Sequence, residues 1–149
     1  MPLGLTFHLV PSNVPSVAFY SWLAALLQGN SAVVRLSSRS NPVQEAMLSL
    51  LNQMFSEVEW HAIAARVRFV RYPHNDAITE YFSVLCYSRV IWGGDSTIHE
   101  IRKIPLSAKA KELCFPDRKS VAVLDSHYLN ELSESEFMQL IQRLGLDIS

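Results

Sequence analysis

Residues 5–36 carry the pattern that most constrains the fold of this chain. In order, they contain the apolar run Leu5–Val10, the polar loop Pro11–Pro15, a helix-like stretch Ser16–Gln28 rich in small residues, a Gly29-Asn30 turn and the apolar run Ser31–Leu36. A strand, a helix and a second strand in this order form a parallel pair with a right-handed crossover. The pattern therefore predicts an α/β sheet, in which ligands bind at the carboxyl edge of the strands.

Strand-like and helix-like segments continue to alternate along the rest of the chain. We expect further strands at residues 66–72, 87–92 and 119–124, and a helix over 74–85. The sequence shows no low-complexity linker and no internal repeat. It therefore predicts one domain, residues 1–149, built on a doubly wound, mostly parallel, Rossmann-like sheet.

Capping sequences predict where three helices begin. Asn41, Thr97 and Ser133 each stand three residues before a side chain that can complete a capping box. These partners are Gln44, Glu100 and Glu136. Pro42 suits the first helical position after Asn41, and Gly145 predicts the end of the last helix.

Composition excludes several classes of protein. The chain has 13 Lys and Arg and 14 Asp and Glu side chains, so its net charge gives no indication of nucleic-acid binding. Its two cysteines, Cys86 and Cys114, argue against a disulfide scaffold or a zinc site, and its five scattered histidines predict no metal. The N-terminus lacks the features of a signal peptide, and the apolar stretch Val17–Leu27 is too short to cross a bilayer. We therefore expect a cytoplasmic location.

Asn13 is the first candidate for a role in catalysis. It lies in the Pro-flanked loop after the first expected strand. A side-chain amide held in such a loop can donate a hydrogen bond to a developing oxyanion, which is commonly worth a factor of about 100 to 1000 in rate. The alternative is that this asparagine only satisfies the geometry of the turn.

Two further groups are candidates for binding phosphate. Arg35 and Arg39 flank Ser37 and Ser38 at the end of the second strand, and guanidinium groups suit phosphate oxygens. The Gly93-Gly94 pair stands between a strand and a helix, where backbone N–H groups can approach a pyrophosphate. The alternatives are two solvated arginines and an ordinary turn.

Longer stretches of the sequence resemble the fatty acyl-CoA reductases of bacterial luminescence systems (the LuxC family), within the aldehyde dehydrogenase superfamily. These stretches are 10–38, 68–76 (RFVRYPHND), 91–98 (IWGGDSTI) and 104–113 (IPLSAKAKEL). Such enzymes reduce long-chain acyl-CoA or acyl-protein thioesters to aldehydes with NADPH, and assemble with acyl-transferase and acyl-protein synthetase subunits. The resemblance implies that the chain is a fragment of such a reductase that holds its dinucleotide-binding domain and is inactive by itself.

The resemblance also implies roles for individual residues. Asn13 matches the asparagine that stabilises the oxyanion, although Ser12 stands where the superfamily usually has tryptophan. Members that prefer NAD often carry a glutamate at the position of Ser38, so a serine between Arg35 and Arg39 implies NADP(H). The glycine pair matches the site of the cofactor's pyrophosphate.

Glu112 and the two cysteines match the superfamily pattern only in part. Glu112-Leu113 matches the first half of the superfamily's Glu-Leu-Gly-Gly run, whose glutamate is a general base, but Cys114 replaces the first glycine. The alternative for Glu112 is a charged residue at a sheet edge. The nucleophilic cysteine of these enzymes follows several elements later, so we expect Cys86 and Cys114 to be small buried side chains and the catalytic cysteine domain to be absent from this chain.

Two other functions remain open on the sequence. The first alternative is part of an NAD-dependent aldehyde dehydrogenase that oxidises aldehydes. The second alternative is a non-catalytic module through which partner subunits assemble.

Overall fold

The computed structural model describes residues 2–39, 41–116 and 123–148, and the chain divides into two compact units, Met1–Asp117 and Arg118–Ser149. The first unit contains a sheet and the helices that cover it. The second contains two helices. Each unit is described by itself.

The first unit is built on a five-stranded sheet in which all described pairs are parallel. The strands are β1 (Leu5–Leu9), β2 (Ser31–Leu36), β3 (Val67–Arg71), β4 (Ser88–Trp92) and β5 (Lys111–Phe115). Their order across the sheet is β3-β2-β1-β4-β5, so the chain reverses direction across the sheet beside β1. The prediction of a doubly wound parallel sheet is therefore confirmed.

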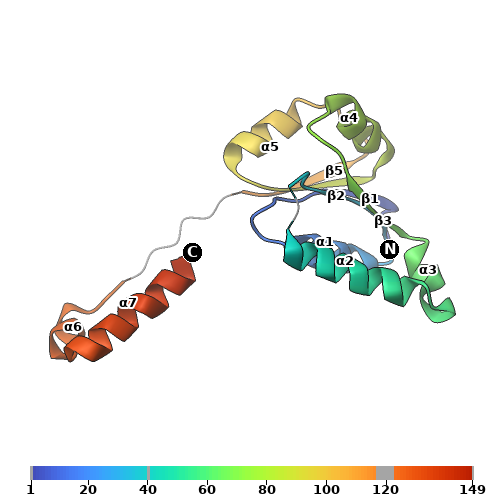
Figure 1. The fold of residues 1–149 in the computed structure, drawn as a ribbon. Coiled ribbons are helices and arrows are strands. Elements are labelled where there is room, and N and C mark those ends of the chain that lie inside the picture. Colours follow the sequence, from blue (N-terminus) through green and yellow to red (C-terminus); the bar gives the residue numbers. More distant parts are fainter. Residues whose placement is uncertain (1, 40, 117–122, 149) are drawn as a thin grey trace. The chain divides into compact units, whose positions relative to one another are not determined.

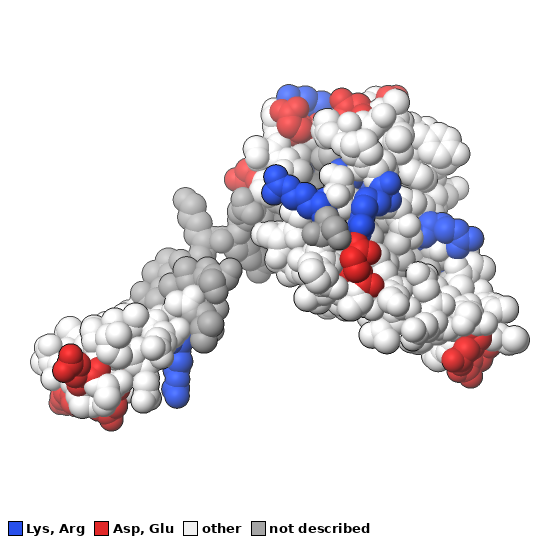
Figure 2. Space-filling view, viewed as in Figure 1, with Lys and Arg blue, Asp and Glu red and all other residues white. Residues whose placement is uncertain are grey.

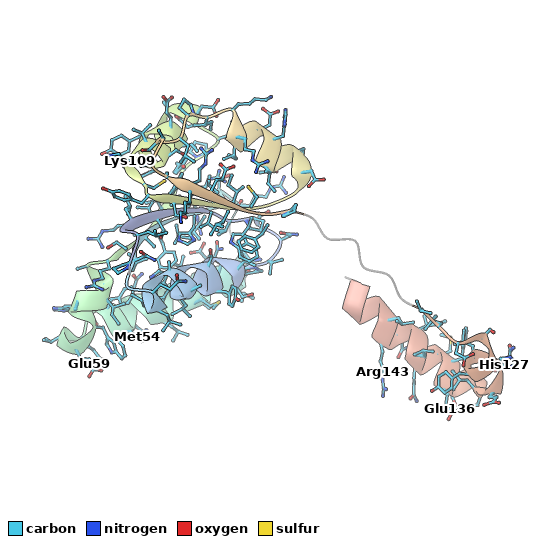
Figure 3. All side chains as sticks on the ribbon, turned by 180° about the vertical axis from the view of Figure 1, so that it is seen from behind. Met54, Glu59, Lys109, His127, Glu136 and Arg143 are labelled. Atoms are coloured by element: carbon cyan, nitrogen blue, oxygen red, sulfur yellow. The ribbon has the colours of Figure 1, made fainter. Side chains whose placement is uncertain are left out.

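Helices cover both faces of this sheet (Figure 1). One side carries α1 (Val17–Leu27), α2 (Pro42–Phe55), the short 3₁₀ helix η1 (Val58–Trp60) and α3 (His61–Ala64). The other side carries α4 (Asp76–Leu85) and α5 (Asp95–Arg102). Side chains fill both spaces between sheet and helices (Figure 3), because alternate strand residues point to opposite faces.

Each face has its own apolar core. Phe7 and Leu9 of β1 pack toward α4 and α5, together with Ile91 and Ile98. Val10, which follows the same strand, packs toward α1 and α2. The residues with which it forms this second core are Ala18, Phe19, Trp22, Ala32, Val34, Leu36 and Val67.

Of the helix starts predicted in the first unit, the cap at Asn41 is confirmed and the capping box at Thr97 is wrong. The Asn41 side chain accepts hydrogen bonds from the backbone N–H groups of Val43 and Gln44, which caps α2. The Gln44 side chain accepts from Arg71 on β3. Thr97 lies inside α5, which begins two residues earlier with Gly94 at its N-cap, so the box predicted there is wrong.

The second unit consists of α6 (Ser126–Glu131) and α7 (Glu134–Ile148). Here the predicted capping box is confirmed, because Ser133 N donates to Glu136 Oε2 at 2.9 Å, at the start of the helix where Figure 3 labels Glu136. Gly145 does not end α7, which continues through it to residue 148.

The strand expected at residues 119–124 is not observed in the part that can be described. Residues 119–122 lie outside the described residues, and Val123 and Leu124 belong to no strand. The fifth strand is instead β5, which the sequence did not predict. Its residues Lys111 and Glu112 are charged and its side chains are only partly buried, as is typical of an edge strand. In the described part of the chain, no helix is both long and apolar enough to span a membrane.

Candidate functional site

Three of the predicted site segments meet at one edge of the sheet. The loop with Asn13 follows β1, Arg35 is the next-to-last residue of β2, and Gly93-Gly94 follows β4. These three strands are neighbours, and Leu9 lies opposite both Arg35 and Ile91 in the register. The segments therefore share the carboxyl edge beside the point where the strand order reverses, which is where open α/β sheets bind ligands.

Asn13 lies in the exposed part of the loop between β1 and α1. The loop closes when Val17 N donates to the Val14 carbonyl at 3.2 Å, just before the helix begins. The amide of Asn13 is consequently accessible from solvent at the carboxyl edge of β1. Its position is compatible with donation to a substrate oxygen.

Arg35 is held toward β3 rather than toward β1. Its Nη2 donates to the Tyr72 carbonyl at 3.3 Å, and its Cζ lies 5.3 Å from the centre of the Tyr72 ring. Tyr72 is fixed in turn by a 3.2 Å hydrogen bond between its hydroxyl and Thr79, and burial raises the pKa of Tyr72. Arg35 Nε is buried and has no hydrogen-bond partner among the described residues. No sequence pattern indicated Tyr72 or Thr79 as neighbours of this arginine.

The segment after β2 forms a tight turn. Arg39 N donates to Ser37 Oγ at 3.1 Å, which orders the backbone between them. Ser37 is half-buried, whereas Ser38 and Arg39 are exposed. The turn therefore presents a hydroxyl and a guanidinium to solvent beside Arg35.

The glycine pair connects β4 directly to α5. Gly93 N donates to the Phe115 carbonyl of β5 at 3.3 Å, and Gly94 is the N-cap residue of α5. A Cβ atom on Gly93 would lie 3.3 Å from the Thr97 side chain, so close packing against the helix favours glycine here. Asp95 lies in the first turn of α5 and places a carboxylate near the backbone N–H groups at the start of this helix. An anion bound by the backbone N–H groups of this turn would therefore lie close to the negative charge of Asp95.

Glu112 lies far from these groups along the sheet. It is the second residue of β5, opposite Arg89 in the register and near the amino end of the strand. Its Oε2 accepts from Arg89 Nε at 2.9 Å, and its Oε1 accepts from Arg102 Nε at 2.7 Å. Burial acts to raise the pKa of Glu112, but the two arginines outweigh it and lower the pKa below its usual value. This arrangement holds the buried Arg89 and gives no support to the general-base role implied by the resemblance.

Neither cysteine has the environment of a nucleophile. Cys86 is 2% exposed and its thiol donates to the Ser83 carbonyl, and burial raises its pKa. Burial and the neighbouring Glu112 carboxylate also raise the pKa of Cys114. Reactive cysteines need a lowered pKa, so both thiols are poor candidates for acylation.

A buried chain of hydrogen bonds runs between β1, α1 and β4, and sequence reasoning missed it. Trp92 Nε1 donates to Ser21 Oγ at 3.0 Å, and Ser21 Oγ lies 2.7 Å from His8 Nδ1. His8 Nε2 lies 2.8 Å from Thr6 Oγ1, which donates to the Ser31 carbonyl at 2.9 Å. The signal in the sequence is the pair of polar residues, Thr6 and His8, inside the apolar run Leu5–Val10.

Metal binding and an extended basic surface find no support. The described residues include no group of three or more His, Cys, Asp or Glu side chains that could hold a metal ion. On the face drawn in Figure 2, the charged side chains form small groups separated by uncharged surface. This distribution differs from the basic stripes of nucleic-acid-binding proteins.

Two relatives of the chain among known proteins carry the same name. The chain is 25% identical over 127 residues to the long-chain acyl-protein thioester reductase of Aliivibrio fischeri, and 30% identical over 128 residues to the protein of the same name from Vibrio harveyi. These matches cover 84% and 83% of the chain and 26% of each relative. The chain therefore spans about a quarter of the length of these relatives.

A solved structure supports the fold. Proline utilization A from Bradyrhizobium japonicum superimposes with a TM-score of 0.59 at 15% identity, over 77% of this chain and 12% of that protein. The family model described as acyl-CoA reductase (LuxC) matches residues 1–149. The whole chain therefore belongs to the acyl-CoA reductase (LuxC) family.

Proposed function

We propose that this chain is the nucleotide-binding portion of an NADPH-dependent reductase that converts long-chain fatty acyl thioesters to fatty aldehydes. One observation carries the proposal. The Asn13 loop follows β1, Arg35 lies at the carboxyl end of β2 and the Gly93-Gly94 turn follows β4, so the three share the carboxyl edge of one parallel sheet. Membership of the family and the names of the relatives supply the acyl-thioester substrate.

The residues at this edge fit a dinucleotide with a 2′-phosphate. Arg35 has a buried Nε that lacks a partner among the described residues, and the segment from Ser37 to Arg39 contains no carboxylate that would repel a phosphate. We assign the ribose phosphate to Arg35, Ser37, Ser38 and Arg39. The pyrophosphate is assigned to the Gly93-Gly94 turn, because the N–H groups of the first turn of α5, which Gly94 precedes, have no partner within the helix.

Asn13 is assigned to the substrate. Its amide lies on the loop after β1, between the two parts of the cofactor site, and would donate a hydrogen bond to the thioester oxygen as negative charge develops. When bound, the reduced nicotinamide supplies the hydride. We assign the acyl-accepting cysteine to a part of a longer enzyme outside these residues, because burial raises the pKa of both Cys86 and Cys114. Partner subunits that transfer and activate the acyl group belong to the same proposal.

The test compares binding of NADPH and NADH to the chain by fluorescence titration. We expect NADPH to bind more tightly, and the double variant Arg35→Ala, Arg39→Ala to lose about tenfold or more in NADPH affinity with little change for NADH, because each guanidinium makes charge-assisted bonds to phosphate. Arg66→Ala is the matched control. It removes one positive charge, as each of the two substitutions does, from an exposed residue before β3, at the opposite edge of the sheet. Equal NADPH affinity in the double variant would overturn the assignment of these arginines.

The same titration separates the two alternatives. A fragment of an NAD-dependent aldehyde dehydrogenase would prefer NADH. An assembly module would bind neither nucleotide, and the apolar side chains on the outer side of α1 and α2 favour that role as second candidate. They include Leu27 and Leu50, which are 84% and 62% exposed. A single-turnover assay with radiolabelled acyl-CoA completes the test, since stable label on Cys86 or Cys114 would refute the assignment of the nucleophile elsewhere.

A further inference from the structure

The buried hydrogen-bond chain from Trp92 to Ser31 has only one consistent direction. Its ends fix it, because an indole N–H can only donate and a backbone carbonyl can only accept. Thr6 spends its one hydroxyl proton on Ser31, so its oxygen accepts from His8 Nε2–H. His8 Nδ1 must then accept from the Ser21 hydroxyl, whose oxygen accepts from Trp92.

Each member of the chain is therefore satisfied only when His8 is neutral and carries its proton on Nε2. Thr6, His8 and Ser21 are 4%, 2% and 5% exposed, so water does not replace a missing partner. A proton on His8 Nδ1 would face the Ser21 hydroxyl and remove its acceptor in this chain. The surroundings agree, because burial lowers the pKa of His8 to about 4.

The Trp92 end of this series of hydrogen bonds lies at the proposed cofactor site. Trp92 is the last residue of β4 and immediately precedes Gly93. Its ring is stacked on Phe115, with ring centres 3.9 Å apart, and forms a T-shaped contact with the Tyr20 ring, with ring centres 6.4 Å apart. Gly93 N is in turn bound to the Phe115 carbonyl. The indole thus has one polar group, and the Ser21 oxygen holds it.

We propose that His8 and Ser21 are positioning residues for the glycine turn. By fixing the Trp92 indole, they hold the end of β4 and the start of α5 in the arrangement from which the N–H groups of Gly94 and of the first turn of α5 bind the pyrophosphate. This inference rests on the proposed function, since it requires that the turn bind a dinucleotide. The same series of hydrogen bonds also links β1, α1 and β4, the three elements that border the point where the strand order reverses.

The first measurement is spectroscopic and needs no cofactor. Nitrogen-15 shifts of His8 in the labelled chain should show an unprotonated Nδ1 and a protonated Nε2 at pH 7. The Trp92 indole N–H should exchange slowly with solvent, and its exchange should accelerate in Ser21→Ala. A His8 tautomer protonated on Nδ1, or an unprotected indole in the wild-type chain, would overturn the inference.

The second measurement is NADPH affinity by fluorescence titration. One intramolecular hydrogen bond is worth about a two- to tenfold change in an equilibrium constant. We expect a loss of that size in Ser21→Ala and in Trp92→Phe, which keeps the aromatic stack but lacks the N–H group. Ser21→Thr retains the hydroxyl and should keep most of the affinity. Ser49→Ala, on the exposed side of α2, and Trp60→Phe, in η1, are the matched controls.

The outcomes separate this inference from the function on which it rests. Wild-type affinity in both Ser21→Ala and Trp92→Phe would overturn the positioning role and leave the cofactor site intact. A wild-type chain that binds no NADPH would overturn both. A loss in the two variants that Ser21→Thr does not share, with unchanged circular dichroism, supports the positioning role, because a general loss of fold would affect all binding and the spectrum together.

Discussion

Replacement of Glu112 by glutamine tests whether this carboxylate is structural. Arg89 is 2% exposed, and both its Nε and its Nη2 donate to Glu112 Oε2. Its remaining donor group, Nη1, is bound to Ser83 and to the Ile104 carbonyl. Glu112→Gln therefore leaves a buried guanidinium without its counter-charge while the shape of the side chain is kept.

The expected loss is large for a single substitution. Breaking a buried ion pair by removing one partner typically costs about 3 to 5 kcal/mol. The amide oxygen still accepts one hydrogen bond, so we expect about 3 kcal/mol in the free energy of unfolding, and roughly 10 °C in melting temperature for a unit of this size. Urea denaturation followed by circular dichroism measures the first quantity and a thermal scan the second.

Two further variants show whether the pair itself is responsible. The Arg102 side chain, the second partner of Glu112, is 59% exposed. Arg102→Ala should therefore lower the free energy of unfolding much less than Glu112→Gln does. The double variant Arg89→Met, Glu112→Leu should be more stable than Glu112→Gln, because it removes both charges instead of stranding one. A Glu112→Gln protein as stable as wild type would refute the structural role and reopen the general-base role.

Two other predictions concern the stability of the fold and require no ligand. Burial lowers the pKa of His8 from 6.5 to about 4, so between these values the unfolded chain binds a proton that the folded chain does not. This contribution to stability is present in full above pH 6.5 and is lost as the pH falls toward 4, by at most about 3 kcal/mol. Urea denaturation across this range should show a flatter pH dependence of the free energy of unfolding in His8→Asn. Equal slopes in the two proteins would contradict the lowered pKa of His8. Asn41→Ala should lower the free energy of unfolding by about 1 kcal/mol, because the backbone N–H groups of Val43 and Gln44 lose their acceptor. Asn52→Ala, in the interior of α2, should instead be neutral or slightly stabilising, and an equal loss in both variants would argue against the cap.

The sequence predicted the order of the elements well where signals are local. The strand Ser31–Leu36 is observed with the predicted bounds, and the caps at Asn41 and Ser133 are present. These features depend on residues within a few positions of one another. The prediction at Thr97 failed because Gly94 and Asp95 already begin the helix, and the helix α7 runs through Gly145 because glycine only permits a helix to end.

The edge strand shows the limit of local pattern. Lys111–Phe115 has neither alternation nor a run of β-branched residues, and it becomes a strand because β4 offers it a hydrogen-bonding partner. The site predictions have a similar standing. The sequence placed Asn13, Arg35 and the glycine pair at or just after the carboxyl ends of strands, and the strand order then brings those strands side by side. Their roles in binding and catalysis remain predictions.

The sequence alone determined that this chain forms a parallel α/β sheet, since strand and helix periodicity and capping residues act over short stretches of chain. Only the tertiary structure decided which polar groups are buried together. Trp92 and Ser21 are 71 residues apart, Arg35 and Tyr72 are 37 apart, and Arg89 and Glu112 are 23 apart. A buried donor must find an acceptor wherever the fold supplies one, and that choice depends on how distant segments pack rather than on any local pattern.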